Sequence, residues 1–223
     1  MSSQLPVVIT IDGPSGAGKG TLSQMLAAHT GYHLLDSGAL YRLVALAALN
    51  VGADLTNEQQ IAQIAAGLDV VFQVEGGAAH IFLAGTDVTA SIRQESVSMA
   101  ASQIAAYPKV RAALLQRQRE FAKLPGLIAD GRDMGTTVFP TAAIKIFLTA
   151  SAEARAERRY RQLAARGETV DMAMLVRDIR ERDERDSNRA ISPLRPADDA
   201  VLIDSTSMDI EEVFAKMLSI INR

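Results

Sequence analysis

The sequence predicts an α/β fold in which helices alternate with the strands of a parallel sheet. The first observation is PVVITI at 6–11, a β-branched run that indicates a buried strand and ends before Gly13. The second is YHLLD at 32–36, a further strand, followed by a helix to about Asn50 for which Ser37 is the expected N-cap. A helix fits between these strands, and the resulting strand–helix–strand–helix order is typical of crossover connections.

Three later runs complete a predicted five-stranded sheet. They are LIAD (127–130), IKIFL (144–148) and AVLID (200–204). Two Arg-rich helices, at about 151–166 and 171–189, separate the last two strands, and a final helix starts near 209. We therefore expect one doubly wound domain over 1–223.

The alternating order changes between residues 68 and 93, where we predict a small antiparallel β insertion. After a helix at 57–66, apolar residues alternate along 70–75, and HIFLA at 80–84 returns after Gly76-Gly77. A third short strand is expected near Asp87-Val88. Helices resume over about 94–122 with an interruption near Pro108.

Composition limits the function classes. A net charge of −3 gives no overall attraction to nucleic acid or to anionic membranes, and the absence of Cys excludes disulfides and Cys-ligated metals. The N-terminus lacks the pattern of a signal peptide, and no apolar run is long enough to span a membrane, so we expect a cytoplasmic protein. Of 23 basic residues 18 are Arg, a bias towards recognition of phosphate and carboxylate.

The segment GPSGAGKGT at 13–21 carries the strongest chemical signal. It matches G-x-x-x-x-G-K between a strand and a helix, where backbone N–H groups cradle phosphates and Lys19 reaches the β/γ-phosphates. The next residue is Gly20 rather than Ser or Thr, and Thr21 follows, which displaces the usual Mg²⁺-ligating hydroxyl by one position. The alternative is a merely flexible glycine turn. We predict that this loop binds a nucleotide phosphate.

Other sequence elements narrow the class of nucleotide-binding protein. No N-K-x-D or D-x-x-G element of a switch GTPase is present, and no apolar strand ends in Asp-Glu as in mechanical ATPases. With switch GTPases and mechanical ATPases excluded, we predict a phosphotransferase that has a second site for an acceptor.

Two strand ends supply candidates for that acceptor site. Asp36-Ser37-Gly38 ends the second strand with Arg42 close behind, and DGRD at 130–133 ends the third. Ligands of open α/β sheets bind beyond the carboxyl ends of the strands. The alternatives are a simple strand-end cap at 36–38 and a structural ion-pair cluster at 130–133.

The helix at 171–189 changes character along one face. The face is apolar for two turns and then charged; it comprises Met172, Leu175, Ile179, Arg182, Asp186 and Arg189. We interpret its charged end as the border of a polar cleft, although pairs such as Asp178–Arg182 and Glu181–Arg185 would also suit a solvated helix. With Arg155, Arg158 and Arg159 of the preceding helix it forms a predicted Arg-rich lid over 151–189.

Four segments together strongly resemble the bacterial cytidylate kinases, a group of P-loop nucleoside monophosphate kinases. They are DGPSGAGKGT (12–21), LLDSGALYR (34–42), LPGLIADGRDMGT (124–136) and RDERDSNRA (182–190). The resemblance spans nearly the whole chain, and the GKGT variant is itself typical of monophosphate kinases. It implies the reaction ATP + CMP or dCMP giving ADP + CDP or dCDP.

The resemblance also implies roles for individual residues. Lys19, Arg132 and Arg182 would be catalytic. ATP would be bound by Gly13, Pro14, Ser15, Gly16, Ala17, Gly18, Lys19, Gly20 and Thr21, with Arg158 from the lid. The acceptor would be bound by Ser37, Arg42, Ser102, Arg111, Arg132, Asp133, Arg182, Asp186 and Arg189. No protein-held metal site is predicted, because Mg²⁺ would be held chiefly by phosphates and water.

The resulting expectation is a P-loop kinase domain with an acceptor-binding region at 37–122, acting as a monomer on small nucleotides, with no nucleic-acid or membrane partner. The alternatives are a P-loop kinase for another acceptor, such as UMP, AMP or shikimate, and a non-catalytic nucleotide-dependent binding protein.

Overall fold

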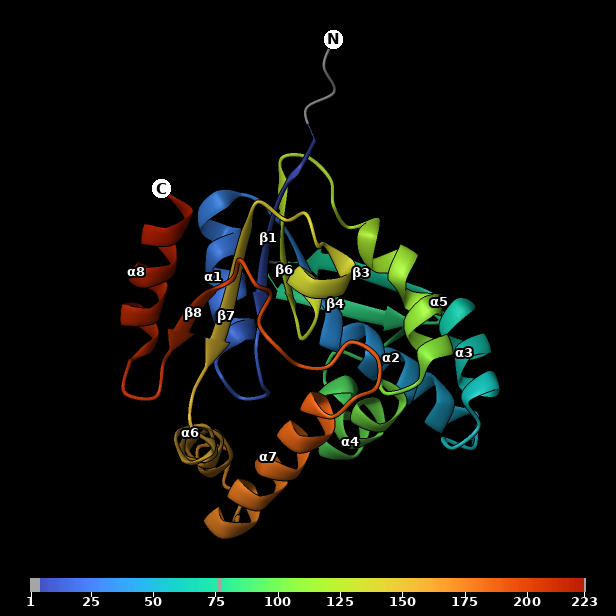
Figure 1. Cartoon of the computed structure of the whole chain (residues 1–223). Helices are drawn as coiled ribbons and strands as arrows, with labels where there is room; N and C mark the ends of the chain where they lie inside the picture. The colour runs from blue at the N-terminus through green and yellow to red at the C-terminus, as the bar shows by residue number, and fades with distance from the viewer. Residues whose placement is uncertain (1–4, 76–77, 223) are drawn as a thin grey trace. The chain divides into compact units, whose positions relative to one another are not determined.

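The computed structural model describes residues 5–75 and 78–222 (Figure 1). The chain divides into two compact units. The first comprises residues 1–36 and 119–223, and the second comprises residues 37–118.

The first unit is built on a five-stranded parallel sheet (Figure 1). Its strands are β1 (Val7–Asp12), β2 (His33–Asp36), β6 (Gly126–Gly131), β7 (Ile144–Thr149) and β8 (Val201–Asp204). Their spatial order is β2-β6-β1-β7-β8, so β1 is central and its neighbours β6 and β7 come much later in the chain. The predicted strands and their parallel arrangement are confirmed.

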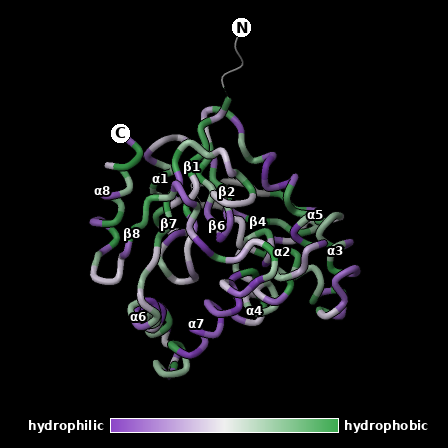
Figure 2. Tube along the Cα trace, in the orientation of Figure 1, coloured by the Kyte–Doolittle hydropathy of each residue, from purple (hydrophilic) through white to green (hydrophobic). Residues whose placement is uncertain are grey.

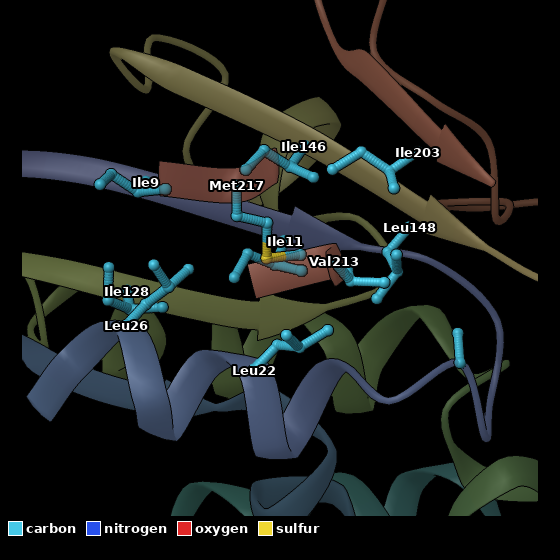
Figure 3. Close-up of a cluster of buried hydrophobic side chains, with 11 residues drawn as sticks. Ile9, Ile11, Leu22, Leu26, Ile128, Ile146, Leu148, Ile203, Val213 and Met217 are labelled. Carbon is cyan, nitrogen blue, oxygen red and sulfur yellow. The ribbon is translucent and has the colours of Figure 1, made fainter. Parts of the chain in front are cut away.

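Helices α1 and α8 cover one face of this sheet. They are α1 (Lys19–Thr30) and α8 (Ile210–Ile221). Figure 3 shows the apolar side chains of this layer, among them Ile9 and Ile11 from β1 against Leu22 and Leu26 from α1. These side chains are almost fully buried. Gly31 ends α1 in a left-handed conformation.

The opposite face of the central strand is polar and lies against a single π-helical turn, η2 (Met134–Val138). Since side chains alternate along a strand, Thr10 and Asp12 point away from the layer that contains Ile9 and Ile11. A Cβ added to Gly135 of η2 would lie 2.9 Å from Thr10 Oγ1, so the turn approaches the strand closely. The π-turn has no counterpart among the sequence-based expectations.

Two further helices of the first unit precede β8. They are α6 (Ala152–Ala164) and α7 (Met172–Ser187), the two predicted Arg-rich helices. Ser151 caps α6 by accepting from the Ala154 N–H, and Asp171 caps α7 by accepting from the Ala173 N–H. Figure 2 shows hydrophilic residues along most of α7.

The second unit is helical with a small sheet. Its helices are α2 (Ser37–Asn50), α3 (Glu58–Ala66), η1 (Ser91–Arg93), α4 (Glu95–Ile104) and α5 (Pro108–Arg119), the last ending one residue beyond the unit. Its antiparallel sheet has the order β3 (Val70–Glu75), β4 (Ala78–Leu83), β5 (Thr86–Asp87). The antiparallel insertion is confirmed, while the predicted turn at Gly76-Gly77 lies outside the described residues.

Ser37 differs from its predicted place. It is the first residue of α2 rather than a preceding cap, and its hydroxyl donates to Gln118 Oε1 at 2.7 Å. A side-chain partner 81 positions away in the chain therefore takes the hydroxyl, which the local sequence pattern does not reveal.

Candidate active site

The glycine-rich loop between β1 and α1 has the backbone of a phosphate cradle. Gly13 approaches β7 so closely that an added Cβ would lie 1.9 Å from the Leu148 carbonyl oxygen. Gly18 caps α1 in a left-handed conformation, with φ of 93°, which glycine adopts without steric cost. The first N–H groups of a 12-residue helix thus follow directly on the loop, where the helix dipole favours an anion.

Lys19 lies folded over this loop. Its side chain is almost fully buried, and Nζ donates to the Pro14 carbonyl oxygen at 2.8 Å. Burial and the neighbouring Arg132 lower the pKa of Lys19 to about 7, against the opposing attraction of Asp130, Asp12 and Asp36. A phosphate placed in the loop would favour the charged ammonium, so anion binding would raise the positive charge of Lys19.

Asp12 connects the loop to the segment after β6. It is the last residue of β1, and its two carboxylate oxygens accept the N–H groups of Met134 and Gly135, each at 2.8 Å. Burial raises the pKa of Asp12 to about 6, while these two amides oppose the rise. Asp12 therefore binds the central strand to the C-terminal end of the segment that follows Gly131 and contains Arg132 and Asp133.

Asp186 of α7 is bonded to two arginine side chains. Its carboxylate accepts from Arg132 Nε at 3.1 Å and from Arg189 Nη2. Arg132 Nη1 also donates to the Gly131 carbonyl oxygen at 3.1 Å, so Nη2 takes no part in either bond. Two guanidiniums around one carboxylate leave a net charge of +1, which suits the binding of phosphate oxygens.

Asp186 remains ionised despite its position. Burial acts to raise its pKa, but Arg132, Arg189 and Arg182 together hold the pKa of Asp186 below the ordinary value. The predicted charged end of the α7 face is thus packed inward, since Asp186 is buried and Arg182 and Arg189 are half-buried. On the exposed side Arg177 lies 3.9 Å from both Asp178 and Glu181, which are pairs of a solvated helix.

Arg155 of α6 is bonded to Asp183 and to backbone carbonyl oxygens. It is 3 % exposed and donates from Nη1 to the Ser15 carbonyl oxygen at 2.9 Å and to Asp183 Oδ1 at 3.0 Å. Its Nη2 donates to the second Asp183 oxygen, and its Nε donates to the Ala150 carbonyl oxygen at 3.0 Å. Arg155 therefore fastens the phosphate loop to α6 and α7.

Arg158, predicted to bind ATP, contacts the segment after β8. Its Nη1 donates to Ser205 Oγ at 3.3 Å, and its Nη2 donates to the carbonyl oxygens of Ser205 and Met208. Its role in ATP binding stays a prediction.

The second unit holds the remaining predicted acceptor residues. Arg111 of α5 donates from Nη1 to the Ala105 carbonyl oxygen at 3.0 Å, and its guanidinium carbon lies 5.5 Å from the centre of the Tyr41 ring. Arg42 follows Tyr41 on α2 and is half-buried. The cationic side chain of Arg111 is thus held by a carbonyl and an aromatic face, an arrangement that retains its charge.

Ser102 and Ser37 are the two hydroxyls predicted for this unit. Ser102 of α4 is buried, and its Oγ makes no hydrogen bond within the part of the chain that the structure describes. Ser37 is buried and bonded to Gln118. A buried hydroxyl without a protein partner is available to a ligand or to water, and the role of Ser102 in acceptor binding stays a prediction.

Several predicted residues of the first unit lie together: Arg132, Asp186 and Arg189 are directly bonded, and Lys19 is near enough to Arg132 for the like charge to lower its pKa. Sequence reasoning missed Asp12, Asp183 and Gln118. Asp12 had one local signal, since a carboxylate ends an otherwise apolar strand; the partners of the other two lie 28 and 81 residues away in the chain.

The parallel sheet, the glycine-rich loop after its central strand and the arginine cluster define a P-loop phosphotransferase. Within that class the chain belongs to the cytidylate kinase family, because residues 9–223 match the family model described as cytidylate kinase.

Curated relatives agree with this assignment. A cytidylate kinase of Stutzerimonas stutzeri (strain A1501) is 60% identical over 214 residues, covering 95% of this chain and 93% of that protein. One from Aeromonas salmonicida (strain A449) is 58% identical over 216 residues, covering 97% and 94%. Among solved structures, an uncharacterized protein from Eubacterium ventriosum has a TM-score of 0.51 at 11% identity, covering 97% of this chain and 98% of that one, which supports the fold alone.

None of the helices within the described residues is long and apolar enough to cross a membrane.

Proposed function

We propose that the protein transfers the γ-phosphoryl group of ATP to the phosphate of CMP or dCMP and so forms ADP with CDP or dCDP. The observation that carries the proposal is the match of residues 9–223 to the cytidylate kinase family, joined to a phosphate loop and an arginine cluster within one compact unit. Relatives that are 60% identical are named cytidylate kinase, and the match covers nearly their whole length.

The residues of the first unit suit direct in-line transfer. The acceptor phosphate is already anionic at neutral pH, so the reaction needs charge stabilisation and positioning more than a general base. The loop at 13–21 would hold the phosphates of ATP, and Lys19 would leave the Pro14 carbonyl to reach them. Arg132, Arg182 and Arg189 would neutralise the charge that develops on the migrating group.

The residues of the second unit suit recognition of the acceptor. Ser37 and Arg42 would bind the acceptor phosphate together with Arg132. Ser102 and Arg111, with Asp133 of the first unit, would bind the edge of the cytosine base. Buried groups that hydrogen-bond a substrate discriminate strongly against analogues that lack the matching group. The buried Ser102 hydroxyl supports this assignment because it makes no hydrogen bond within the described part of the chain.

We propose that Mg²⁺ accompanies ATP. Among the described residues no group of three or more His, Cys, Asp and Glu side chains could hold a metal ion. Asp130 Oδ2 lies 3.7 Å from where a Cβ on Gly20 would stand, and the exposed Thr21 follows in α1. These few oxygen donors fit an ion that is coordinated mainly by nucleotide phosphates and water. When bound, Mg²⁺ would neutralise phosphate charge.

The remaining expectations concern assembly and location. We propose that the enzyme acts as a monomer in the cytoplasm and has no nucleic-acid partner. The net charge of −3 supports the last of these points, because it gives no overall attraction to nucleic acid. Light scattering of the purified chain should give the mass of one copy, 23.9 kDa.

An acceptor panel tests the proposed function. ADP formation from ATP would be followed by a coupled assay with CMP, dCMP, UMP, AMP and shikimate at equal concentrations. We expect the highest kcat/KM with CMP or dCMP. A higher value with another acceptor would overturn the assignment of substrate, and slow ATP turnover that no acceptor stimulates would overturn the assignment as a kinase.

A further inference from the structure

Asp12 has no role in the proposed reaction, although it lies between the phosphate loop and the segment that carries Arg132. It is the last residue before the phosphate loop and is 4 % exposed. Both of its carboxylate oxygens are bonded, one to the Met134 N–H and one to the Gly135 N–H, each at 2.8 Å. Neither bond partner is a side chain, so the carboxylate acts on the backbone of another segment.

The bonded amides begin η2. The first N–H groups of a helical turn have no partners within the turn and need acceptors from elsewhere. Asp133, the N-cap of η2, makes no capping hydrogen bond with its own side chain. Asp12 supplies the two acceptors from the neighbouring strand instead.

The segment between β6 and η2 is consequently fixed at both ends to β1. At its start Gly131 pairs with Asp12 in the parallel ladder. At its end the Asp12 carboxylate holds Met134 and Gly135. Close packing leaves little slack, since a Cβ added to Gly131 would lie 2.7 Å from the Met134 side chain. Only Arg132 and Asp133 lie between these attachments.

We propose that Asp12 is a positioning residue for phosphoryl transfer, whose carboxylate fixes the 131–135 segment, and with it Arg132, relative to the phosphate loop. The inference rests on the proposed function, in which Arg132 stabilises the transferred group. Because Asp12 is adjacent to Gly13 in the chain, one residue determines the distance between the donor-binding loop and the charge-stabilising side chain. A displacement of about 1 Å can cost about 10²-fold in rate.

The test compares Asp12→Asn with the wild type and with Thr10→Val. Asparagine keeps the size of the side chain but offers one acceptor oxygen, so one of the two amides loses its partner. Thr10 is a matched control because it is buried on the same face of β1, and its hydroxyl makes no hydrogen bond among the described residues. Each protein would be assayed with the acceptor that the wild type turns over best, so a wrong acceptor identity would not be mistaken for a wrong role of Asp12.

For Asp12→Asn we expect kcat to fall about 10²-fold, with a KM for ATP within about threefold of the wild type, because the loop backbone itself is retained. Thr10→Val should keep both constants. The proposal is overturned if Asp12→Asn retains kcat within about threefold. It is equally overturned if the KM for ATP rises as much as kcat falls, since the residue would then support the loop and not Arg132.

A measurement on the wild type keeps the proposal testable should the variant fail to fold. The backbone N–H resonances of Met134 and Gly135 would be followed by NMR between pH 5 and 8. Because both amides bind one carboxylate whose pKa is raised to about 6, they should shift together with one midpoint in that range. The charged groups facing Asp12 are Asp133 and Lys19, and the midpoint should move in an Asp133→Asn variant without the two amides becoming independent. Amides that titrate with different midpoints would overturn the proposal, since one carboxylate would then not hold both ends of the contact.

Discussion

Asp12 and Asp186 are buried to nearly the same degree, 4 % and 1 % exposed, yet their carboxyl groups respond in opposite directions. Burial raises the pKa of Asp12 to about 6, since its bonds are to two backbone amides. At Asp186 burial is outweighed by Arg132, Arg189 and Arg182, which hold the pKa below the ordinary value. At Asp12 the two amides offset the effect of burial only in part, whereas at Asp186 the arginine charges outweigh it.

The two carboxylates act on the same short segment from different sides. Asp12 holds the backbone at Met134 and Gly135, and Asp186 holds the Arg132 side chain through Nε. Asp186 bonds Nε of Arg132 and leaves Nη2 outside that bond, whereas Asp12 contacts only the backbone. We infer that Asp186 orients the Arg132 side chain and that Asp12 positions the backbone that carries it.

The largest effect is expected from removing Arg132. In Arg132→Ala the charge that faces the migrating group is lost, and kcat should fall about 10³-fold. The fold should survive, because Asp186 keeps its bond to Arg189. Steady-state kinetics and thermal unfolding would measure both. The exposed Arg161→Ala on α6 is the matched control and should leave both unchanged. Near-normal turnover in Arg132→Ala would exclude its assigned role.

A smaller effect is expected from neutralising Asp186. Asp186→Asn leaves Arg132 and Arg189 beside each other without a carboxylate between them, so the free energy of unfolding should fall by about 3 kcal/mol. The pKa of Asp186 is lowered on folding, so its contribution is present above the unfolded value and is lost as pH falls through the folded value. Urea unfolding at pH 7 and pH 3 would therefore show a difference between wild type and variant that shrinks at the lower pH.

Asp178→Asn provides the control for that comparison. Asp178 is on the same helix, but its side chain is 56% exposed and lies 3.9 Å from Arg177. Its replacement should change stability by less than about 1 kcal/mol. Equal losses in the two variants would show that the Asp186 cluster contributes nothing beyond a surface ion pair.

The sheet could be predicted from sequence because each strand is a local signal. PVVITI, LIAD and IKIFL are short apolar runs bounded by turn residues, and their pattern does not depend on distant partners. Their spatial order β2-β6-β1-β7-β8 is not local and came only with the structure. The π-turn η2 likewise has no periodic pattern, because its first amides are satisfied by Asp12, more than a hundred residues earlier.

The candidate site likewise has features that the sequence predicts and contacts that it does not. The glycine pattern of the phosphate loop and the charged end of the α7 face are readable within one element, and Asp186 at that end is buried. The partners of those charges are not readable, since Arg132 with Asp186 and Arg155 with Asp183 join separate elements. Arg155 illustrates the consequence: grouped by sequence with arginines that reach over nucleotides, it is bonded to Asp183 and to backbone carbonyls.

The smallest expected effect concerns the pH dependence of stability, and it sharpens the contrast between Asp12 and Asp186. Because the folded pKa of Asp12, about 6, exceeds its ordinary value of 3.8, the native state binds more protons between these limits. The stability linked to Asp12 is therefore fully present below the unfolded pKa and is lost as pH rises through about 6.

Unfolding free energies of the wild type and Asp12→Asn would be measured by denaturant titration at several pH values. The difference, wild type minus variant, should be about 2 kcal/mol larger at pH 4.5 than at pH 7, because asparagine cannot take up the proton. The same subtraction for Asp186→Asn should show the opposite sign, a difference that shrinks as pH falls through the low pKa of Asp186. A difference for Asp12→Asn that is flat, or that grows with pH, would mean that the amides of Met134 and Gly135 compensate the buried charge fully. Asp12 would then join Asp186 as a permanently ionised group, and the two carboxylates would differ only in what they hold.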